Sequence, residues 1–241
     1  MEPVLLALDT STERMALALQ WPGGRLTQVE AGGALASSRL IPALLQLLQR
    51  AELSMQRVDA VAFGAGPGAF TGLRSACSVA QGLAFAIDRP VLPLDSLMLV
   101  AEDAAGQAPI DALLWVAMDA RMDEVYAAAY LPHAEGWRVQ VAPALYTLPA
   151  LAARWLQQAP AWLAGSAIEA FGARLPVGRA RCVPTERDRG AALAQLARRA
   201  WSQGQAMAAP LALPIYLRDK VAFTTDERAR ARAAAAFDGP R

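Results

Sequence analysis

The chain has little histidine, lysine or cysteine among its 241 residues, and each scarcity argues against a class of site. His133 is the only histidine, which excludes paired-histidine metal motifs. Its turn-like setting, LPHAEG, favours a surface loop over a Ser-His-Asp triad. Lys220 is the only lysine. Cys77 and Cys182 lie far apart without a C-x-x-C spacing, so we expect both to be reduced and buried.

An excess of charge of one sign and long apolar runs are also missing. Lys and Arg total 23 against 22 Asp and Glu, and the net charge of +1 predicts no general attraction to nucleic acid or to a membrane surface. No run of about 18 residues lacks both charge and proline, which predicts no membrane-spanning helix. Residues 1–3 lead directly into a predicted strand, so we expect no secretory signal and a cytoplasmic protein.

The first half alternates short apolar runs with amphipathic segments, which is typical of an α/β fold. The hydrophobic content of 55% suffices for one large or two small domains. The sequence predicts strands at 4–8, 15–21, 26–30, 58–63 and 91–94. It predicts helices from Ser37 or Ser38 to Ala51 with Pro42 in the first turn, over Leu73–Gln81 with Thr71 as cap, and from Ser96 to Ala105.

The second half repeats this layout. LALDTSTERMALALQ at 6–20 and VAMDARMDEVYAAAY at 116–130 each predict a strand, an aspartate, a polar turn and a second strand. The aspartates, Asp9 and Asp119, are 110 residues apart, which favours two copies of one unit. Further predictions are strands at 113–118, 124–131, 138–141, 161–164 and 180–183, helices at 148–158, 166–175 and 191–202, and an extended segment at 210–218.

Two stretches have the composition of phosphate-binding loops. Asp9, Thr10, Ser11 and Thr12 follow the first strand, where a carboxylate can hold a Mg²⁺-bound water and hydroxyls can meet phosphate. The alternative is a turn whose side chains bond their own backbone. Four glycines and a proline occupy 64–72 between a strand and a helix, but without the lysine of a Walker A motif. A tight turn that only launches the helix is the alternative there.

Two further groups of residues have structural and functional interpretations. Asp119, Arg121, Asp123 and Glu124 can pair with one another, contact a partner or form a solvated turn. The helix after the Gly-rich loop is rich in small residues, and both it and the helix before it are apolar over more than one stripe. These two helices therefore form a buried pair or pack closely against another chain.

Four segments, in this order, resemble the TsaB (YeaZ) family, a bacterial component of the tRNA threonylcarbamoyladenosine system. They are LALDTST at 6–12, GAGPGAFTGLR at 64–74 with AQGLA at 80–84, MDARMDEVYAAAY at 118–130, and PIYLRDKVA at 214–222. The resemblance extends over about residues 4–222. Ala69 replaces the serine of the family's GPGSFTGLR, and Ala36 replaces a histidine that usually precedes the first helix.

The resemblance implies an α/β fold of two related lobes, of the actin-like and Hsp70-like ATPase (RNase H-like) type. Residues 1–108 would form the first lobe with partner-binding helices, 109–222 the second lobe, and 223–241 a flexible tail. The paired histidines of the catalytic relative, TsaD, correspond here to Ser96 and Val100. The adenosine-binding signature of the fold has only a poor counterpart at 163–172.

In function, the resemblance implies a non-catalytic subunit that supports a TsaD-type transferase together with a TsaE-type ATPase. No cofactor would be required, and ATP or ADP would bind weakly or at a site shared with the partner. The chain would form a homodimer in isolation and meet tRNA only indirectly. The alternatives are an autonomous phosphotransferase or ATPase that uses Asp9 and the Gly-rich loop, and a nucleotide-sensing module without turnover.

The resemblance assigns two sets of residues. Vestigial phosphate loops would contain Asp9, Thr10, Ser11, Gly66 and Gly68. The partner interface would be an exposed surface on the helices at 38–51 and 71–87, formed by Leu40, Leu44, Leu47, Leu48, Arg74, Ala76, Val79 and Leu83.

Overall fold

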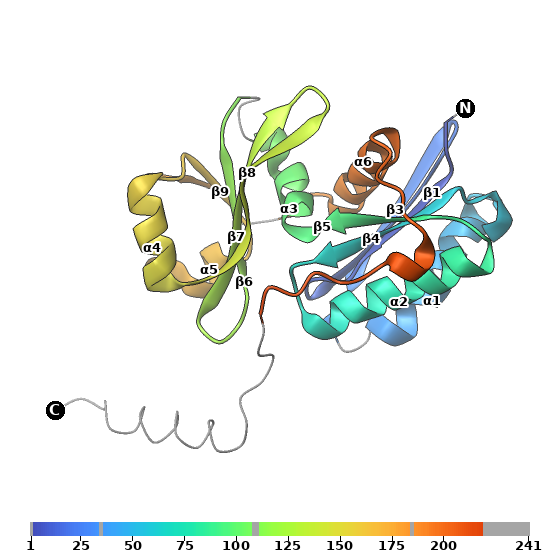
Figure 1. Cartoon of the computed structure of the whole chain (residues 1–241), viewed down its shortest axis with the longest axis horizontal. Coiled ribbons are helices and arrows are strands. Elements are labelled where there is room, and N and C mark those ends of the chain that lie inside the picture. The colour runs from blue at the N-terminus through green and yellow to red at the C-terminus, as the bar shows by residue number, and fades with distance from the viewer. Residues whose placement is uncertain (1, 34–35, 108–110, 184–185, 219–241) are drawn as a thin grey trace, which may run out of the picture.

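The computed structural model describes residues 2–33, 36–107, 111–183 and 186–218, and these residues form two lobes (Figure 1). Each lobe has a five-stranded mixed sheet, ordered β3-β2-β1-β4-β5 and β10-β9-β6-β7-β8 within these residues. The first sheet comprises β1 (Leu5–Asp9), β2 (Arg14–Trp21), β3 (Gly24–Ala31), β4 (Ala60–Gly66) and β5 (Val91–Asp95). The second comprises β6 (Leu114–Asp119), β7 (Glu124–His133), β8 (Gly136–Thr147), β9 (Trp162–Ala164) and β10 (Arg181–Val183).

The two sheets have the same connectivity. In each, three antiparallel strands come first, and two further strands then pair in parallel beside the first strand. Asp9 ends β1 and Asp119 ends β6, so the two aspartates are equivalent in the repeat. The predicted fold of two related actin-like lobes is therefore confirmed. The boundary predicted at residues 108 and 109 lies outside the described residues and stays a prediction, as does the tail at 223–241.

Helices cover both faces of each sheet. The first half contributes α1 (Ala36–Arg50), α2 (Phe70–Ala86) and α3 (Ser96–Ala104), with 3₁₀ turns η2 (Met55–Arg57) and η3 (Ala105–Gln107). The second half contributes α4 (Leu148–Gln157), α5 (Ala167–Phe171) and α6 (Arg189–Ser202), with η4 (Gly172–Arg174) and η5 (Ala209–Leu211). Among the described residues, no helix is both long and apolar enough to cross a membrane.

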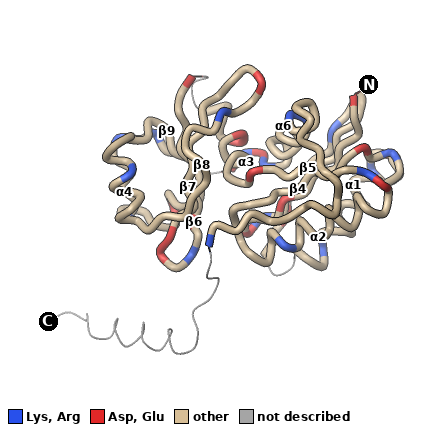
Figure 2. Tube along the Cα trace, viewed as in Figure 1, with Lys and Arg blue, Asp and Glu red and all other residues tan. Residues whose placement is uncertain are grey.

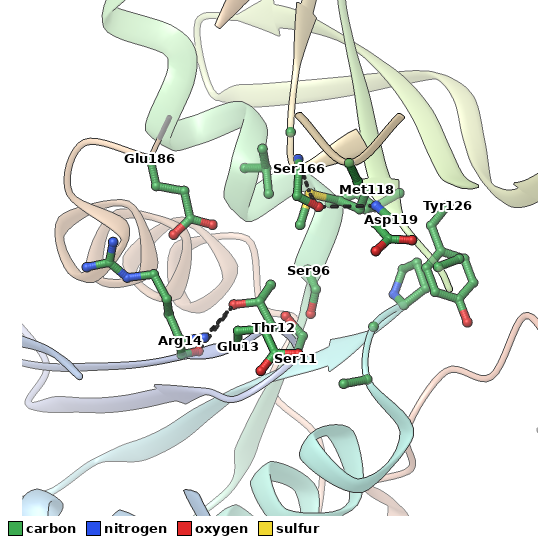
Figure 3. A pocket seen from close by; sticks show the side chains of 18 of the residues that line it. Ser11, Thr12, Glu13, Arg14, Ser96, Met118, Asp119, Tyr126, Ser166 and Glu186 are labelled. Atoms are coloured by element: carbon green, nitrogen blue, oxygen red, sulfur yellow. Dashed lines mark hydrogen bonds between the residues drawn. The ribbon is translucent and has the colours of Figure 1, made fainter. Parts of the chain in front are cut away.

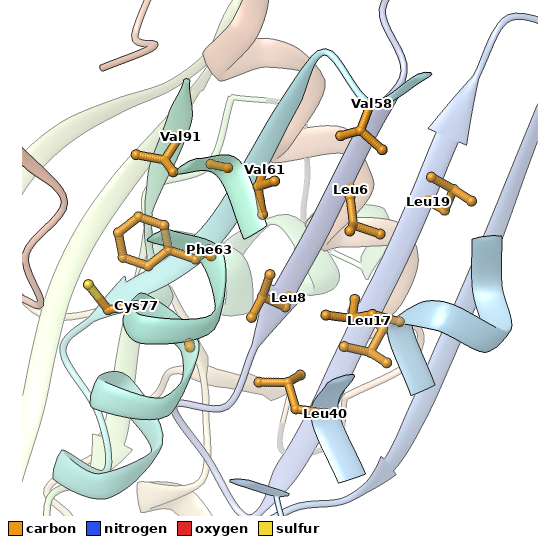
Figure 4. Packing of buried hydrophobic residues seen from close by; sticks show 14 of the residues in the cluster. Leu6, Leu8, Leu17, Leu19, Leu40, Val58, Val61, Phe63, Cys77 and Val91 are labelled. Carbon is orange, nitrogen blue, oxygen red and sulfur yellow. The ribbon is translucent and has the colours of Figure 1, made fainter. Parts of the chain in front are cut away.

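Side-chain size alternates along the central strands of the first lobe. Large residues such as Leu8, Leu17 and Phe63 lie on the face that α1 and α2 cover (Figure 4). Small residues such as Ala16 and Ala62 lie on the opposite face, where α6 packs. Because successive strand residues point to opposite faces, this alternation produces one deep interface and one that a helix can approach closely.

The third helix of each half packs on the other half's sheet. α3 lies against the second sheet, where Leu97 and Val100 join the cluster of Leu114 and Tyr130. α6 lies against the first sheet, where Leu193 joins the cluster of β1, β2, β4 and β5 residues. α3 and α6 also contact each other between the sheets. This exchange ties the lobes together through their cores.

Residues 205–218 return to the first lobe, and we call them the strap. Met207 pairs with Val91 at the edge of β5, and the Ile215 N–H donates to the Ala65 carbonyl at 2.7 Å. The predicted extended segment at 210–218 is therefore present, although it starts with the 3₁₀ turn η5. In Figure 1 the strap runs along α2 as the last coloured part of the chain.

Several local predictions are wrong. α1 begins at Ala36, so Ser37 and Ser38 lie inside the helix instead of capping it, and Pro42 lies beyond the first turn. The residue before α2 is Ala69, which has no side chain able to cap, and Thr71 lies inside the helix. The helix propensity and capping preference of single residues locate the first residue of a helix only to within about one or two positions.

One prediction about the cysteines is also wrong. Cys77 is buried beneath the strap, as expected, whereas Cys182 on the edge strand β10 is exposed.

The predicted exposed patch on α1 and α2 is wrong for most of its members. They are fully or almost fully buried and pack against the large-residue face of the first sheet: Leu40, Leu44, Leu47, Leu48 and Ala76. Val79 and Leu83 are half-buried beside the same cluster, and only Arg74 is exposed. The four leucines that were predicted to be exposed instead form the inward face of α1, which the first sheet covers.

We predict that Leu44→Ala destabilises the fold by about 3 kcal/mol, since it leaves a cavity beneath α1. The neighbouring Leu45 is 53% exposed and gives a matched control, for which Leu45→Ala should change the free energy of unfolding by less than about 0.5 kcal/mol. Urea denaturation measures both values. Equal effects at the two positions would contradict the assignment of the buried face.

Candidate functional site

A cleft of about 1050 Å³ separates the two lobes at the ends of β1 and β6. The turn after β1 contributes Ser11, Thr12, Glu13 and Arg14 to its wall. Figure 3 shows Ser11 and Thr12 across the cleft from Met118, Asp119 and Ser166 of the second lobe, while Arg14 extends towards Glu186. In α/β sheets this edge, at the carboxyl ends of parallel strands, is where ligands collect.

Asp9 lies behind this wall and is completely buried. Its Oδ1 accepts hydrogen bonds from Arg189 Nη2 at 2.9 Å and from Ser11 Oγ at 2.9 Å. Its Oδ2 accepts from Ser96 Oγ at 3.2 Å. The carboxylate is thus bonded through both oxygens, and it does not reach the cleft. Both oxygens of the Asp9 carboxylate are therefore engaged by side chains of the protein in this structure.

Arg189, the first residue of α6, is the cation that neutralises Asp9. Its side chain is 1% exposed, and Nη1 also donates to Glu186 Oε1 at 2.6 Å. Burial alone would lower the pKa of the Arg189 guanidinium, but the charges of Asp9 and Glu186 outweigh burial and raise it. The guanidinium therefore stays charged beside Asp9.

The Gly-rich loop packs directly on the turn after β1. A Cβ at Gly64 would lie 1.8 Å from Asp9 Oδ2, and a Cβ at Gly72 would lie 1.8 Å from the Thr10 carbonyl oxygen. The Ala69 N–H donates to the Ser11 carbonyl at 2.8 Å, and Thr10 Oγ1 donates to the Gly72 carbonyl at 2.6 Å. The glycines allow this close approach. Two donors of these loops, the Ala69 N–H and the Thr10 hydroxyl, are thereby bonded to the backbone of the neighbouring loop.

Asp119, the equivalent of Asp9 in the second lobe, lies in a different setting. Its side chain is 18% exposed to the cleft, and its Oδ2 pairs with Arg121 Nη1 at 3.1 Å. The following turn is left-handed at three consecutive residues, Arg121, Met122 and Asp123, with φ near +60°. Such residues are strained, at about 1–2 kcal/mol each, and the turn is held by the Ala120 N–H to Glu124 carbonyl bond.

The left-handed turn aims Arg121 across the mouth of the cleft. Its Nη2 lies 2.7 Å from Glu13 Oε1, which joins the turns after β1 and β6. Both side chains are more than two-thirds exposed, so this bridge is screened by solvent and contributes little to stability. Arg218 of the strap supports the turn from below through the Arg121 carbonyl and Glu124.

Polar contacts between residues that do not line the cleft also join the two lobes. Tyr130 of β7 donates its hydroxyl to Asp95 Oδ2 at 2.6 Å, while Asp95 Oδ1 caps α3. Burial raises the pKa of the Asp95 carboxyl, although its hydrogen bonds oppose the shift, and burial also raises the pKa of Tyr130. Trp137 Nε1 donates to Glu102 Oε2 at 2.6 Å, and Arg199 pairs with the same oxygen.

The charges around the cleft do not favour a polyphosphate. Its walls carry the carboxylates of Glu13, Asp103, Asp119, Glu169 and Glu186 against the guanidinium groups of Arg14, Arg121 and Arg218. Figure 2 shows positive and negative residues interspersed over both lobes. Within the described ranges, no three His, Cys, Asp or Glu side chains gather closely enough to hold a metal ion.

Only some of the residues that were assigned to phosphate loops reach the surface of the cleft. Ser11 and Gly68 line the cleft, whereas Asp9, Thr10 and Gly66 lie behind its surface. Arg189 was missed, because one arginine just before a predicted helix carries no signal of its partner 180 residues away. His133 is exposed at the end of β7, where its Nδ1 accepts a hydrogen bond from the Glu135 N–H at 3.4 Å.

The chain is similar in sequence and in fold to proteins of one family. The family model described as TsaD, tRNA N6-adenosine threonylcarbamoyltransferase, matches residues 34–161. The structure of YeaZ from Pseudomonas aeruginosa is 38% identical, with a TM-score of 0.79, and the match covers 89% of this chain and 100% of that one. The chain belongs to the TsaB (YeaZ) family.

Two curated relatives carry the name tRNA threonylcarbamoyladenosine biosynthesis protein TsaB. The Haemophilus influenzae protein is 42% identical over 122 residues, about half the length of either chain. The Escherichia coli protein is 29% identical over 228 residues, 91% of this chain and 96% of that one.

We predict that Arg189→Leu destabilises the protein by about 3–5 kcal/mol, because Asp9 stays buried without its counter-charge. Arg198→Leu is the control on the same helix: its ion pair with Glu2 is long, at 3.9 Å, and exposed, so the loss should stay below about 1 kcal/mol. Adding Asp9→Asn to Arg189→Leu should recover most of the stability. Thermal and urea denaturation measure these values, and equal effects of the two arginine variants would refute the role of the buried pair.

Proposed function

We propose that this chain is a non-catalytic subunit in tRNA threonylcarbamoyladenosine biosynthesis, which binds a TsaD-type transferase and works with a TsaE-type ATPase. The pathway follows from the names of its TsaB relatives. The observation that carries the non-catalytic role is the ion pair of Asp9 and Arg189. It occupies the carboxylate that an enzyme of this fold would need for Mg²⁺ and phosphate.

The second lobe supports the same interpretation. The segment proposed as a poor adenosine loop, 163–172, forms the end of β9 and the five-residue helix α5. Its Gly165 packs on the β6 backbone, since a Cβ there would lie 2.3 Å from the Ala117 carbonyl oxygen. We propose that no cofactor is required and that ATP or ADP binds the cleft weakly or only together with the partner.

The partner would bind the outer surface of α1 and α2. Both helices cover the outer face of the first sheet (Figure 1). Ile41 and Leu45 are 45% and 53% exposed on α1, and Phe85 is 73% exposed on α2. These side chains replace the buried leucines as the proposed contact residues, together with Arg74 and the half-buried Val79 and Leu83. In isolation, we propose, the same surface forms a homodimer, and tRNA is contacted only indirectly.

Leu45→Glu should weaken binding of the TsaD-type subunit at least tenfold, because a carboxylate would be desolvated at the centre of the contact. The control is Leu156→Glu on α4, a leucine that is 89% exposed and lies on the other lobe. Calorimetry measures the affinities. In a reconstituted assay with the TsaD- and TsaE-type proteins, omission of this chain should abolish tRNA modification, and full modification without it would refute the proposal.

An autonomous phosphotransferase or ATPase is the competing proposal, and the cleft volume is what favours it. We expect the purified chain to hydrolyse ATP no faster than buffer containing Mg²⁺. Turnover that disappears in Asp9→Asn would overturn the non-catalytic role. Calorimetric titration of ATP and ADP into the chain alone separates a nucleotide-sensing module, which binds tightly, from the weak binding proposed here.

A further inference from the structure

The strap is fixed along one flank of α2 and runs antiparallel to it. Gln81 Nε2 donates to the Ala209 carbonyl at 3.0 Å, and Arg74 Nε donates to the Tyr216 hydroxyl at 3.0 Å. Between these ends, Cys77 of α2 contacts the Ala212 carbonyl. These contacts define which side of the strap faces the helix and which side faces outward.

The outward side of the strap is apolar. Leu211, Leu213 and Ile215 alternate along it and are 64%, 73% and 46% exposed, whereas Ala212 between them is 2% exposed. Leu211 ends the 3₁₀ turn η5, and Leu213 and Ile215 lie in the extended part, where successive residues point to opposite sides. With the strap bonded to α2, all three side chains are exposed to solvent. A continuous row of exposed aliphatic residues is unusual on a monomer and marks a contact surface.

A rigid aromatic group ends the row. The Arg74 guanidinium lies 3.9 Å from the centre of the Phe70 ring, and the Tyr216 ring lies 5.1 Å from Phe70. Tyr216 is 43% exposed, and Arg74 is exposed above α2. Tyrosine and arginine are the residue types that most often dominate binding energy, and this stack holds both in one conformation before any partner binds.

The strap row continues the surface of α1 and α2. Of the ten large hydrophobic residues exposed in the described part of the chain, seven lie on α1, α2 or the strap. The remaining three, Met122, Val139 and Leu156, lie on the second lobe. α2 contacts both α1 and the strap, and its exposed side carries Phe85 beside small residues such as Ser78 and Gly82, where an added Cβ would meet no atom within 4 Å. The three neighbouring elements thus carry most of the exposed apolar side chains.

We propose that the strap, through Leu211, Leu213, Ile215 and the Arg74–Tyr216 stack, forms half of the docking surface for a homologous subunit of the same two-lobed fold. The inference rests on the proposed function, which places that subunit on α1 and α2. The family model that matches residues 34–161 is named for the transferase, so that subunit is a relative of this chain. Such a relative can pack helices of its own against α1, α2 and the strap.

The test compares three variants of the full chain by calorimetry with the TsaD-type subunit. Leu213→Glu should raise the Kd at least tenfold, as Leu45→Glu should, while Leu156→Glu leaves it unchanged. Because Leu213 is 73% exposed, its variant should melt at the temperature of the parent chain. Hydrogen exchange on the unaltered complex adds a readout that needs no variant: the amides at 211–213, 215 and 216 should become protected.

The outcomes are distinct. If Leu45→Glu weakens binding but Leu213→Glu does not, and the strap amides gain no protection, the strap proposal is wrong while the proposed function stands. If Leu213→Glu reduces only self-association, the strap serves a second copy of this chain and the proposal is overturned. If neither variant affects an otherwise tight complex, both the strap and the α1–α2 surface are wrong.

Discussion

The buried ion pair of Asp9 and Arg189 joins the two halves of the chain behind the wall of the cleft. Asp9 ends the central strand of the first sheet, and Arg189 begins the helix that the second half places on that sheet. Both side chains of the ion pair are buried, so loss of either one would leave an uncompensated charge in the core and destabilise the fold. The pair therefore adds a charged contact to the apolar packing that holds α6 on the first sheet.

The exchange of α3 and α6 gives the pair its setting. Each helix covers the sheet of the other half and contacts its counterpart between the sheets. Asp95 with Tyr130, and Glu102 with Trp137, add buried polar contacts across the same junction. The two lobes are therefore joined both by shared apolar clusters and by polar contacts between their elements.

The first lobe uses its two sides differently. Its inner side is filled by the contacts of Gly64 and Gly72 with the turn after β1, so the loop that resembles a phosphate cradle stabilises the core. Its outer side leaves Ile41, Leu45 and Phe85 on the helices, and the strap adds Leu213. Apolar exposure therefore concentrates where the proposed partner binds, away from the cleft.

The sequence determined most of the architecture, because short apolar runs, glycines and the repeated strand-Asp-turn pattern are local signals that survive without tertiary context. The boundaries at Ser96, Leu148 and Val91 follow from such signals. Tertiary structure alone decided that Leu44 points inward and Leu45 outward, since an apolar helix with two candidate faces does not say which one a sheet will cover. It also decided the fate of Asp9: a counter-charge 180 residues away is brought beside it only by the exchange of α6, and no local pattern encodes that contact.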